Sequence, residues 1–243
     1  MINCNNITKK YEDLLVLDNL SLKVNPGEFL VLLGPSGCGK STLLQIIAGF
    51  QNSDSGEILI NGEKLEKPDK RFGYVFQDYA LFKWRTVLGN VVVGIQEKKN
   101  NVEIGMDLLK KVGLEGFAHQ YPHQLSGGMK QRVGLARALA YNPEILLMDE
   151  PFGALDAQTR KLMQQELLRL LKEFNKTIVF VTHSVIEAVY LADRVIVLSS
   201  SPARILLDLK IDIDGHRHYT DNLFLEYRKR ILYYINQETG VKD

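Results

Sequence analysis

A chain of 243 residues with 45% hydrophobic content is long enough for one large α/β domain or two small ones with a buried core. Its 30 basic and 29 acidic residues leave a formal charge of +1, which excludes a bulk electrostatic attraction to nucleic acid or anionic membranes. No apolar run approaches the roughly 20 residues of a membrane span, and the N-terminus lacks the basic and apolar regions of a secretory signal. We therefore expect a cytoplasmic protein without a disulfide framework, since its two cysteines, Cys4 and Cys38, lie far apart in the sequence.

The first quarter of the chain predicts an antiparallel sheet that leads into a buried core. Short runs of alternating apolar residues indicate strands, and a wholly apolar run indicates a buried parallel strand. Asn61-Gly62 is a strong signal for a tight hairpin after one of these strands. The predicted strands are residues 2–8, 20–24, 29–33 and 57–60.

A glycine-rich stretch follows the buried strand and leads into a helix at residues 43–48. Gly34, Gly39, Lys40 and Ser41 occupy the fixed positions of the phosphate-binding loop GxxxxGK[ST]. Glycines let the backbone amides converge on an anion, and the helix adds the positive end of its dipole. We expect Lys40 to reach the β- and γ-phosphates and Ser41 to ligate Mg²⁺. The alternative is a turn that binds nothing, and we assign Cys38 no catalytic role. The complete cradle is Gly34, Pro35, Ser36, Gly37, Cys38, Gly39, Lys40, Ser41 and Thr42.

Residues 78–141 change from strand patterns to helical ones, which suggests an inserted helical subdomain. Two amphipathic stripes predict helices, and Gly113 is a plausible stop for the second. Residues 79–85 form an aromatic and basic loop that suggests a docking surface. The first stripe is Leu88, Val91, Val92 and Ile95, and the second is Ile104, Leu108 and Val112.

A second anion-type site is predicted where a helix begins at Ser126 and continues through Ala140. Ser126 occupies the N-cap position, and Gly127 and Gly128 leave the first amides uncovered. Either the chain binds two anions, or this second site serves the nucleotide of a different molecule.

Polar residues follow three predicted core strands, at 72–76, 144–148 and 177–182. Gln77 follows the first, Asp149 and Glu150 follow the second, and His183 follows the third. Ligands bind at the carboxyl ends of strands in open α/β sheets, and paired carboxylates there suit Mg²⁺ binding and activation of water. The run Ser184–Glu187 predicts a capping box that starts a helix directly after His183. Further predictions are a long helix with Leu167, Leu170, Leu171 and Phe174 on its buried face, closing strands at 194–198 and 204–209, and a terminal helix at 220–235.

These motifs, in this order, resemble the nucleotide-binding subunit of an ATP-binding cassette (ABC) transporter across nearly the whole chain. The combination of a phosphate loop with the Leu125-Ser126-Gly127-Gly128 signature is close to diagnostic. The resemblance implies an α/β P-loop NTPase core with a RecA-like parallel sheet, an N-terminal antiparallel β subdomain and an inserted α-helical signature subdomain. It also implies one ABC ATPase domain over residues 1–243, with 1–77 and 142–243 forming the core and β subdomain and 78–141 the helical subdomain.

The resemblance further implies a role for each candidate site residue. Tyr11, expected in the loop after the first strand, would stack on adenine. Lys40, Ser41 and Thr42 would hold phosphates and Mg²⁺, with Asp149 and Gln77 also at the metal. Glu150 would be the general base, and His183 would contact the γ-phosphate. Ser126, Gly127 and Gly128 would cover the ATP of a second copy, so the chain would form a head-to-tail dimer around two ATP molecules.

The resemblance implies a peripheral subunit on the cytoplasmic face of the membrane, bound to integral permease subunits and served indirectly by an extracytoplasmic solute-binding protein, with no nucleic-acid partner. Four features are similar to the importer branch for nitrate, sulfonate, taurine and bicarbonate: Phe82–Val87, the following Asn90-Val91, the Met129 signature and Ser201–Ile205. An importer of a thiamine precursor or another small solute is an alternative, and a soluble ABC ATPase outside transport is a second. The intact Glu150 and His183 argue against a non-catalytic module.

Overall fold

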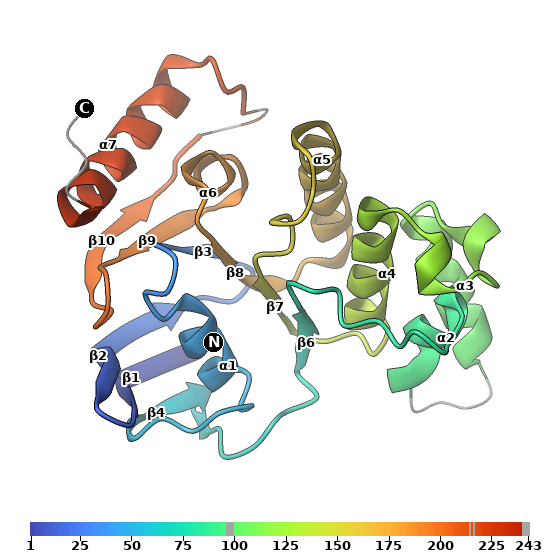
Figure 1. Ribbon diagram of the computed structural model, residues 1–243, viewed down its shortest axis with the longest axis horizontal. Helices are drawn as coiled ribbons and strands as arrows, with labels where there is room; N and C mark the ends of the chain where they lie inside the picture. Colours follow the sequence, from blue (N-terminus) through green and yellow to red (C-terminus); the bar gives the residue numbers. More distant parts are fainter. Residues whose placement is uncertain (96–99, 214, 216, 240–243) are drawn as a thin grey trace. The chain divides into compact units, whose positions relative to one another are not determined.

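The computed structural model describes residues 1–95, 100–213, 215 and 217–239 (Figure 1). The chain divides into two compact units, one of Met1–Asp69 with Thr177–Asp243 and one of Lys70–Lys176. The second unit is larger than the expected insertion at 78–141, because two core strands and a long helix group with the insertion. The assignment of the whole chain to one ABC ATPase domain stays a prediction.

Among the residues that the structure describes, the first unit contains two sheets and three helices. Its elements are β1 (Ile2–Tyr11), β2 (Leu14–Val24), β3 (Phe29–Leu33), α1 (Lys40–Ile47), β4 (Ser55–Ile60), β5 (Glu63–Lys64), β8 (Thr177–Thr182), α6 (Val185–Leu191), β9 (Arg194–Leu198), β10 (Ile205–Lys210) and α7 (Asn222–Thr239). The antiparallel sheet has the order β2-β1-β4-β5, and the hairpin predicted at Asn61-Gly62 is confirmed by positive φ angles of 54° and 85°. The predicted antiparallel β subdomain is therefore present.

The first two strands extend beyond the predicted 2–8 and 20–24. Their antiparallel pairing continues until Tyr11 lies opposite Leu14, so the polar ends of both strands are held by the backbone ladder. The prediction that Tyr11 lies in a loop was wrong, because it is the last residue of β1. Cross-strand hydrogen bonding overrides the weak local pattern there.

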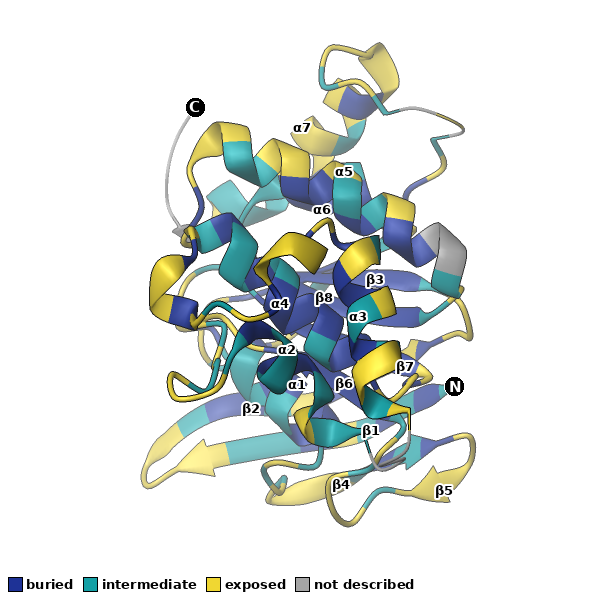
Figure 2. Ribbon diagram, turned by 90° about the vertical axis from the view of Figure 1, so that its right-hand side faces the viewer, coloured by how far each residue is buried: buried dark blue, intermediate teal, exposed yellow. Residues whose placement is uncertain are grey.

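The second sheet of this unit has the order β10-β9-β3-β8, with β3 parallel to both β8 and β9. Every residue of β3 and β8 is buried, as Figure 2 shows, which explains why both strands are continuous apolar runs. Helix α1 lies on one face of the sheet, while α6 and α7 cover the other (Figure 1). The phosphate loop therefore emerges from a strand that is fixed on both edges and both faces.

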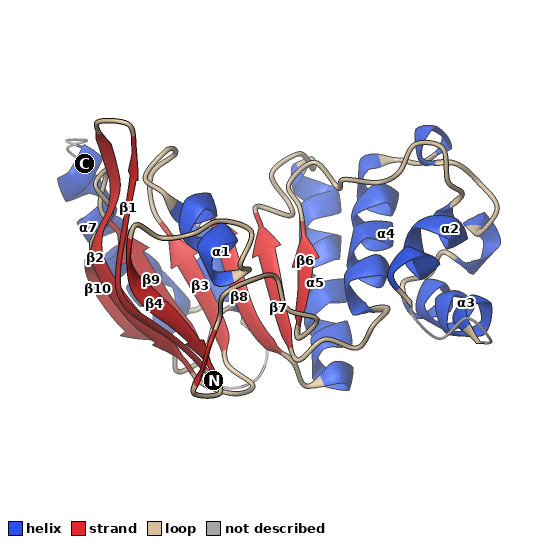
Figure 3. Cartoon of the chain, turned by 90° about the horizontal axis from the view of Figure 1, so that it is seen from below, coloured by secondary structure: helices blue, strands red, loops and turns tan. Residues whose placement is uncertain are grey.

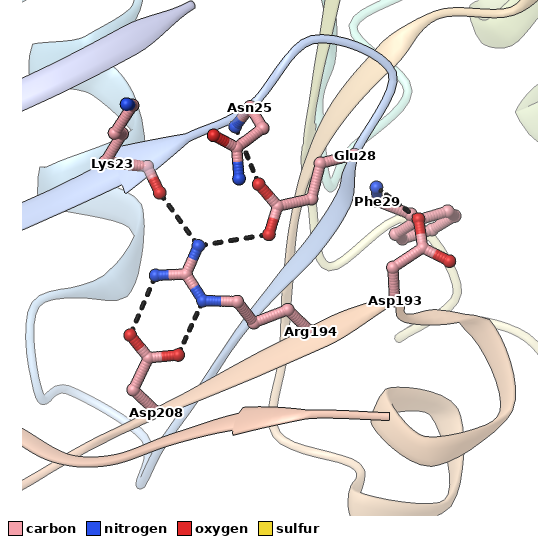
Figure 4. Close-up of polar contacts among 7 residues, drawn as sticks. All are labelled: Lys23, Asn25, Glu28, Phe29, Asp193, Arg194 and Asp208. Atoms are coloured by element: carbon pink, nitrogen blue, oxygen red, sulfur yellow. Dashed lines mark hydrogen bonds and ion pairs between the residues drawn. The ribbon is translucent and has the colours of Figure 1, made fainter. Parts of the chain in front are cut away.

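A group of polar contacts around Arg194 and Asp193 fixes the start of β3 (Figure 4). The Arg194 guanidinium donates to both carboxylate oxygens of Asp208, at 2.5 and 2.7 Å, and to Glu28 Oε1 at 3.0 Å. Its Nη1 atom also donates to the Lys23 carbonyl at 2.9 Å. The hydrogen bonds to the Asp208 and Glu28 carboxylates raise the pKa of Arg194. Asp193 accepts a hydrogen bond from the Phe29 amide at 2.9 Å. These contacts tie the turn that precedes β3 to β9 and β10.

The second unit combines one parallel strand pair with a group of helices. Its elements are β6 (Phe72–Val75), α2 (Val87–Val91), a 3-10 turn (Val92–Gly94), α3 (Asn101–Lys111), two further 3-10 turns (Glu115–Phe117 and Pro122–Gln124), α4 (Gly127–Leu139), β7 (Ile145–Asp149) and α5 (Ala157–Phe174). Strand β6 is parallel to β7, and α4 packs against β6, α2, α3 and α5 (Figure 3). No helix in the described ranges has the length and hydropathy of a membrane span.

The helix predicted along the stripe from Leu88 to Ile95 is shorter than expected. Helix α2 ends at Val91, and a 3-10 turn brings the chain to Ile95 in an extended conformation. Two glycines and a run of three valines make this segment a poor α-helix. The stop predicted at Gly113 is confirmed, since its φ of 67° follows the end of α3.

Candidate functional site

The phosphate loop curls around the Lys40 ammonium group. Lys40 is only 4% exposed, and its Nζ donates to the Gly34 carbonyl at 3.0 Å and to the Pro35 carbonyl at 2.7 Å. Helix α1 begins at Lys40, and its first turn presents amides outside the i→i−4 ladder. A buried cation and the positive end of a helix thus meet in one loop, an arrangement suited to phosphate.

Two glycines of the loop are required by conformation or by close packing. Gly39 has a φ of 108°, and a Cβ there would lie 2.9 Å from side-chain atoms of both Val16 and Leu17. Gly37 also has a positive φ, 77°, but a Cβ there would meet no atom within 4 Å. The loop is therefore closed against β2 at Gly39 and open at Gly37.

His183 lies at the same sheet edge as the phosphate loop. Leu33 pairs with Thr182 in the parallel register of β3 and β8, so Gly34 and His183 both leave the sheet one residue later. His183 is exposed, and the Ser184 hydroxyl caps α6 immediately after it by accepting from the Glu187 amide at 3.3 Å. The structure therefore brings His183 and the loop together within the first unit.

Gln77, Asp149 and Glu150 meet at one edge of the second unit. Val75 pairs with Met148 in the parallel register of β6 and β7, so Gln77 and Glu150 each follow two residues after this pair. Asp149 is 8% exposed and accepts a 3.4 Å hydrogen bond from the Tyr74 hydroxyl. Burial and the Asp149 charge both raise the pKa of Tyr74. Tyr74 therefore stays a donor that orients the Asp149 carboxylate.

Glu150 adopts a left-handed backbone conformation with a φ of 41°. Its carbonyl accepts from the Gly153 amide at 3.0 Å, and a Cβ on Gly153 would lie 3.7 Å from Glu150 Oε2. Left-handed non-glycine residues cost free energy and cluster at functional sites. The tight turn after β7 therefore holds Glu150 in a costly backbone conformation, with its carboxylate close to Gly153.

Tyr11 lies in the first unit and is 42% exposed. Its hydroxyl donates to Gln51 Oε1 at 2.8 Å, and Lys9 Nζ lies 5.6 Å from the ring centroid. The ring is thus held at its polar end and remains accessible.

The signature residues begin α4 in the second unit. Ser126 is the exposed N-cap and accepts from the Met129 amide at 3.3 Å. Gly128 is buried, and a Cβ there would lie 2.9 Å from Thr159 Cγ2 of α5. The glycines were predicted to leave amides uncovered, and the structure adds that Gly128 lets α4 approach α5.

The aromatic loop predicted as a docking surface presents Trp84, which is 73% exposed. The fully buried Asn90 builds this loop, since its side chain accepts from the Phe82 amide at 2.7 Å and donates to three loop carbonyls at 2.9 to 3.2 Å. Sequence reasoning missed the organising roles of Asn90 and Tyr74, because both depend on contacts with residues whose positions only the fold defines.

Each unit offers donor groups of the kinds that bind a nucleotide or a metal ion. The loop offers a cation, helix amides and an unobstructed position at Gly37. Ser41, Gln77 and Asp149 offer the oxygen ligands that Mg²⁺ prefers. These residues are divided between the two units, with Ser41 in the first and the other two in the second.

Comparison with known proteins gives consistent matches along the chain. Residues 17–153 match a family model described as ABC transporter. An uncharacterized ABC transporter ATP-binding protein of Methanocaldococcus jannaschii is 52% identical over 241 residues, covering 96% of this chain and 90% of that protein. The aliphatic sulfonates import ATP-binding protein SsuB of Bacillus cereus is 42% identical over 226 residues, covering 93% and 90%. The taurine import ATP-binding protein TauB of Escherichia coli is 47% identical over 216 residues, covering 87% and 85%.

Solved structures match as well. A dimeric post-hydrolysis structure of the ATP-binding cassette MJ0796, bound to ADP and phosphate, has a TM-score of 0.77 and 35% identity, and the match covers 88% of this chain and 100% of that one.

Proposed function

We propose that this chain, which belongs to the ABC transporter family and is one of its ATPases, powers the uptake of a small solute. The observation that carries the proposal is the presence in one chain of two anion-type helix termini, at α1 and at α4. The first has its own lysine, while the second presents an exposed Ser126. The dimeric relative supports the view that the second terminus serves the ATP of a twin molecule.

In this proposal the phosphate loop binds the triphosphate of the chain's own ATP. Lys40 exchanges its two carbonyl partners for β- and γ-phosphate oxygens, and Ser41 and Thr42 lie in the first turn of α1 beside it. Tyr11 stacks on the adenine. When bound, Mg²⁺ neutralises charge on the phosphate oxygens. Ser41, Asp149 and Gln77 are the residues that would hold it.

Glu150 is proposed as the general base, because it follows the end of β7 at the edge where Gln77 follows β6, and it has a left-handed backbone of the kind that clusters at functional sites. His183 is proposed to contact the γ-phosphate from the edge that it shares with the phosphate loop. Gln77 is proposed to contact the metal and to respond there to the conformation of the membrane subunit.

The head-to-tail homodimer is proposed from Ser126 and from the dimeric relative. Ser126, Gly127 and Gly128 would cover the ATP of the twin. Each nucleotide then makes charge-assisted contacts with both chains, so binding favours the closed dimer and loss of phosphate favours opening. The work available is limited by the difference in nucleotide affinity between the two states.

The solute is proposed to belong to the sulfonate, taurine and nitrate class, because SsuB and TauB are similar over most of the chain. The chain would lie at the cytoplasmic face of the membrane, bound to permease subunits through the Trp84 loop, with an extracytoplasmic binding protein delivering the solute and no nucleic-acid partner. A thiamine-precursor importer remains the alternative within transport. A soluble ABC ATPase is the alternative outside it.

ATP-dependent dimerisation tests the central claim. Glu150→Gln removes the proposed base while keeping size and polarity, so this variant is expected to bind ATP, lose turnover and elute as a dimer with ATP but as a monomer with ADP. Lys40→Ala in the same background is the matched control and is expected to stay monomeric. A Glu150→Gln variant that binds ATP and stays monomeric would contradict the dimer.

Purification from membranes separates the transporter from a soluble factor. Tagged protein from detergent-solubilised membranes is expected to retain a hydrophobic permease, and Trp84→Ala is expected to weaken that retention without changing the ATPase activity of the isolated chain. Recovery of ribosomal or DNA-repair proteins in place of a permease would favour the soluble alternative.

A further inference from the structure

The segment directly after Gln77 has an unusual backbone. Tyr79 and Ala80 both adopt left-handed conformations, with φ angles of 60° and 46°. Two consecutive non-glycine residues of this kind are costly, so surrounding contacts must stabilise them. The Ala80 amide donates to the Asp78 carbonyl at 2.6 Å, which closes a tight turn.

The side chain of Arg137, on α4, binds the backbone carbonyls of this turn. Its Nη1 donates to the Ala80 carbonyl at 2.6 Å, and its Nη2 donates to the Tyr79 carbonyl at 2.9 Å. Burial of the side chain lowers the pKa of Arg137. A planar guanidinium can serve two acceptors in a fixed fork, which a lysine ammonium cannot reproduce.

The Tyr79 side chain extends from this clamp toward the signature. A Cβ on Gly134 would lie 3.8 Å from the Tyr79 carbonyl oxygen, whereas a Cβ on Gly127 would lie 3.3 Å from the Tyr79 hydroxyl. Gly127 and Gly134 are two turns apart on α4, a rise of about 10 Å. Tyr79 therefore runs along two turns of the helix, from the Arg137 clamp to the first residue after Ser126.

We propose that Tyr79 and Arg137 form a strut that makes the Gln77 loop and the signature end of α4 move as one body. This inference rests on the proposed dimer, in which Gln77 belongs to the chain's own ATP and the signature belongs to the ATP of the twin. Movement of Gln77 at one site is then transmitted, through Tyr79 and the rigid helix, to the signature that completes the other site. The two are positioning residues that couple the sites.

The physical basis is the stiffness of each link. The turn at 78–80 cannot adjust freely, because both left-handed residues are held by the Arg137 fork. The helix that carries the fork also carries Ser126 at its N-terminus. A ligand shifts an equilibrium only when it binds two states differently, and the strut makes the states of the two sites depend on each other.

Steady-state ATP hydrolysis by the full chain measures this coupling. Arg137→Lys and Tyr79→Ala are expected to lower the Hill coefficient for ATP from above 1 to about 1, the value for uncoupled sites. Arg169→Lys is the matched control, because Arg169 also donates to a backbone carbonyl, that of Lys111 at 2.7 Å, but on the α5 side of the unit. Its Hill coefficient is expected to equal that of the unmodified chain. Tyr79→Phe keeps the ring and is expected to retain most of the coupling.

Dimerisation in the Glu150→Gln background separates failure of the strut from failure of the dimer. Each strut variant, combined with Glu150→Gln, is expected to dimerise with ATP and to unfold within a few degrees of the parent. If the parent Glu150→Gln does not dimerise, the proposed function fails. Two results would show that the strut proposal is wrong although the Glu150→Gln parent dimerises. One is that Arg137→Lys and Tyr79→Ala keep the Hill coefficient of the unmodified chain. The other is that the unmodified chain itself has a Hill coefficient of 1. An equal loss in Arg169→Lys would also overturn the strut proposal.

Discussion

Thr182 donates a 2.6 Å hydrogen bond to the buried carboxylate of Glu187, and the same Thr182 hydroxyl accepts from the Ser184 amide at 3.0 Å. His183 lies between these anchored residues, so its backbone is fixed from both sides. The contact links the end of β8 to the first turn of α6.

We expect Glu187→Ala to lower kcat for ATP hydrolysis several-fold with little change in KM. Removing the carboxylate leaves the buried Thr182 hydroxyl without this acceptor, at a cost of about 1 to 3 kcal/mol in the free energy of unfolding, and releases His183 from its position. Glu187→Gln keeps an acceptor oxygen and is expected to be milder in both assays. Parallel steady-state kinetics and urea unfolding make the comparison, and an Ala variant with parental kcat would show that His183 needs no such anchor.

Lys40→Ala is expected to weaken ATP binding by tenfold or more, because a charge-assisted contact of about 1.5 to 3 kcal/mol is lost. Isothermal titration calorimetry with ATP measures the change. Lys176→Ala serves as a control, since Lys176 donates to Asn142 in the second unit, whereas the phosphate loop belongs to the first. ATP affinity equal to the parent would remove Lys40 from the site.

Gly128→Ala is expected to destabilise the second unit by about 1 to 3 kcal/mol, the usual cost of overpacking. The added methyl group would lie 2.9 Å from Thr159 Cγ2, which is so close that the Thr159 side chain or one of the helices must shift. Thr159→Ser removes that methyl group, so the double variant is expected to recover stability. Thermal unfolding of the single and double variants gives the result, and equal loss in both would point to the backbone of α4 as the cause.

Stability at low pH is expected to depend on Asp156, the N-cap of α5. Asp156 Oδ1 accepts from the Thr159 amide at 3.0 Å and from the Gln158 amide at 3.1 Å, and these bonds lower the pKa of the carboxyl below its ordinary 3.8. A lowered pKa in the folded state stabilises the protein above the ordinary value, and this contribution is lost as pH falls through the folded pKa.

Asp156→Asn keeps a capping oxygen but cannot ionise. The difference in unfolding midpoint between the parent and Asp156→Asn is expected to be larger at pH 7 than at pH 3. A difference that does not change with pH would show that the Asp156 charge contributes nothing.

Most core strands were predicted from short-range pattern, because a strand buried on both faces is wholly apolar and ends at a polar residue. The phosphate loop and the candidate positions after β6, β7 and β8 followed from the same reasoning. The first insertion helix was predicted too long, since hydrophobic spacing fits both an α-helix and the mixed α and 3-10 turns that glycine and valine favour there. Tyr11 was misplaced because antiparallel pairing, which no local pattern reports, extends β1 to include it.

The sequence alone determined the phosphate loop and the order of the motifs, because each depends on residue types at fixed short spacings, and the family resemblance of those motifs implied the fold class. Only the tertiary structure decided which residues support those motifs. Tyr74 orients Asp149, Asn90 builds the Trp84 loop, and Arg137 clamps the turn after Gln77. These contacts join residues brought together by packing, and hydrogen-bond geometry between distant segments cannot be read from spacing along the chain.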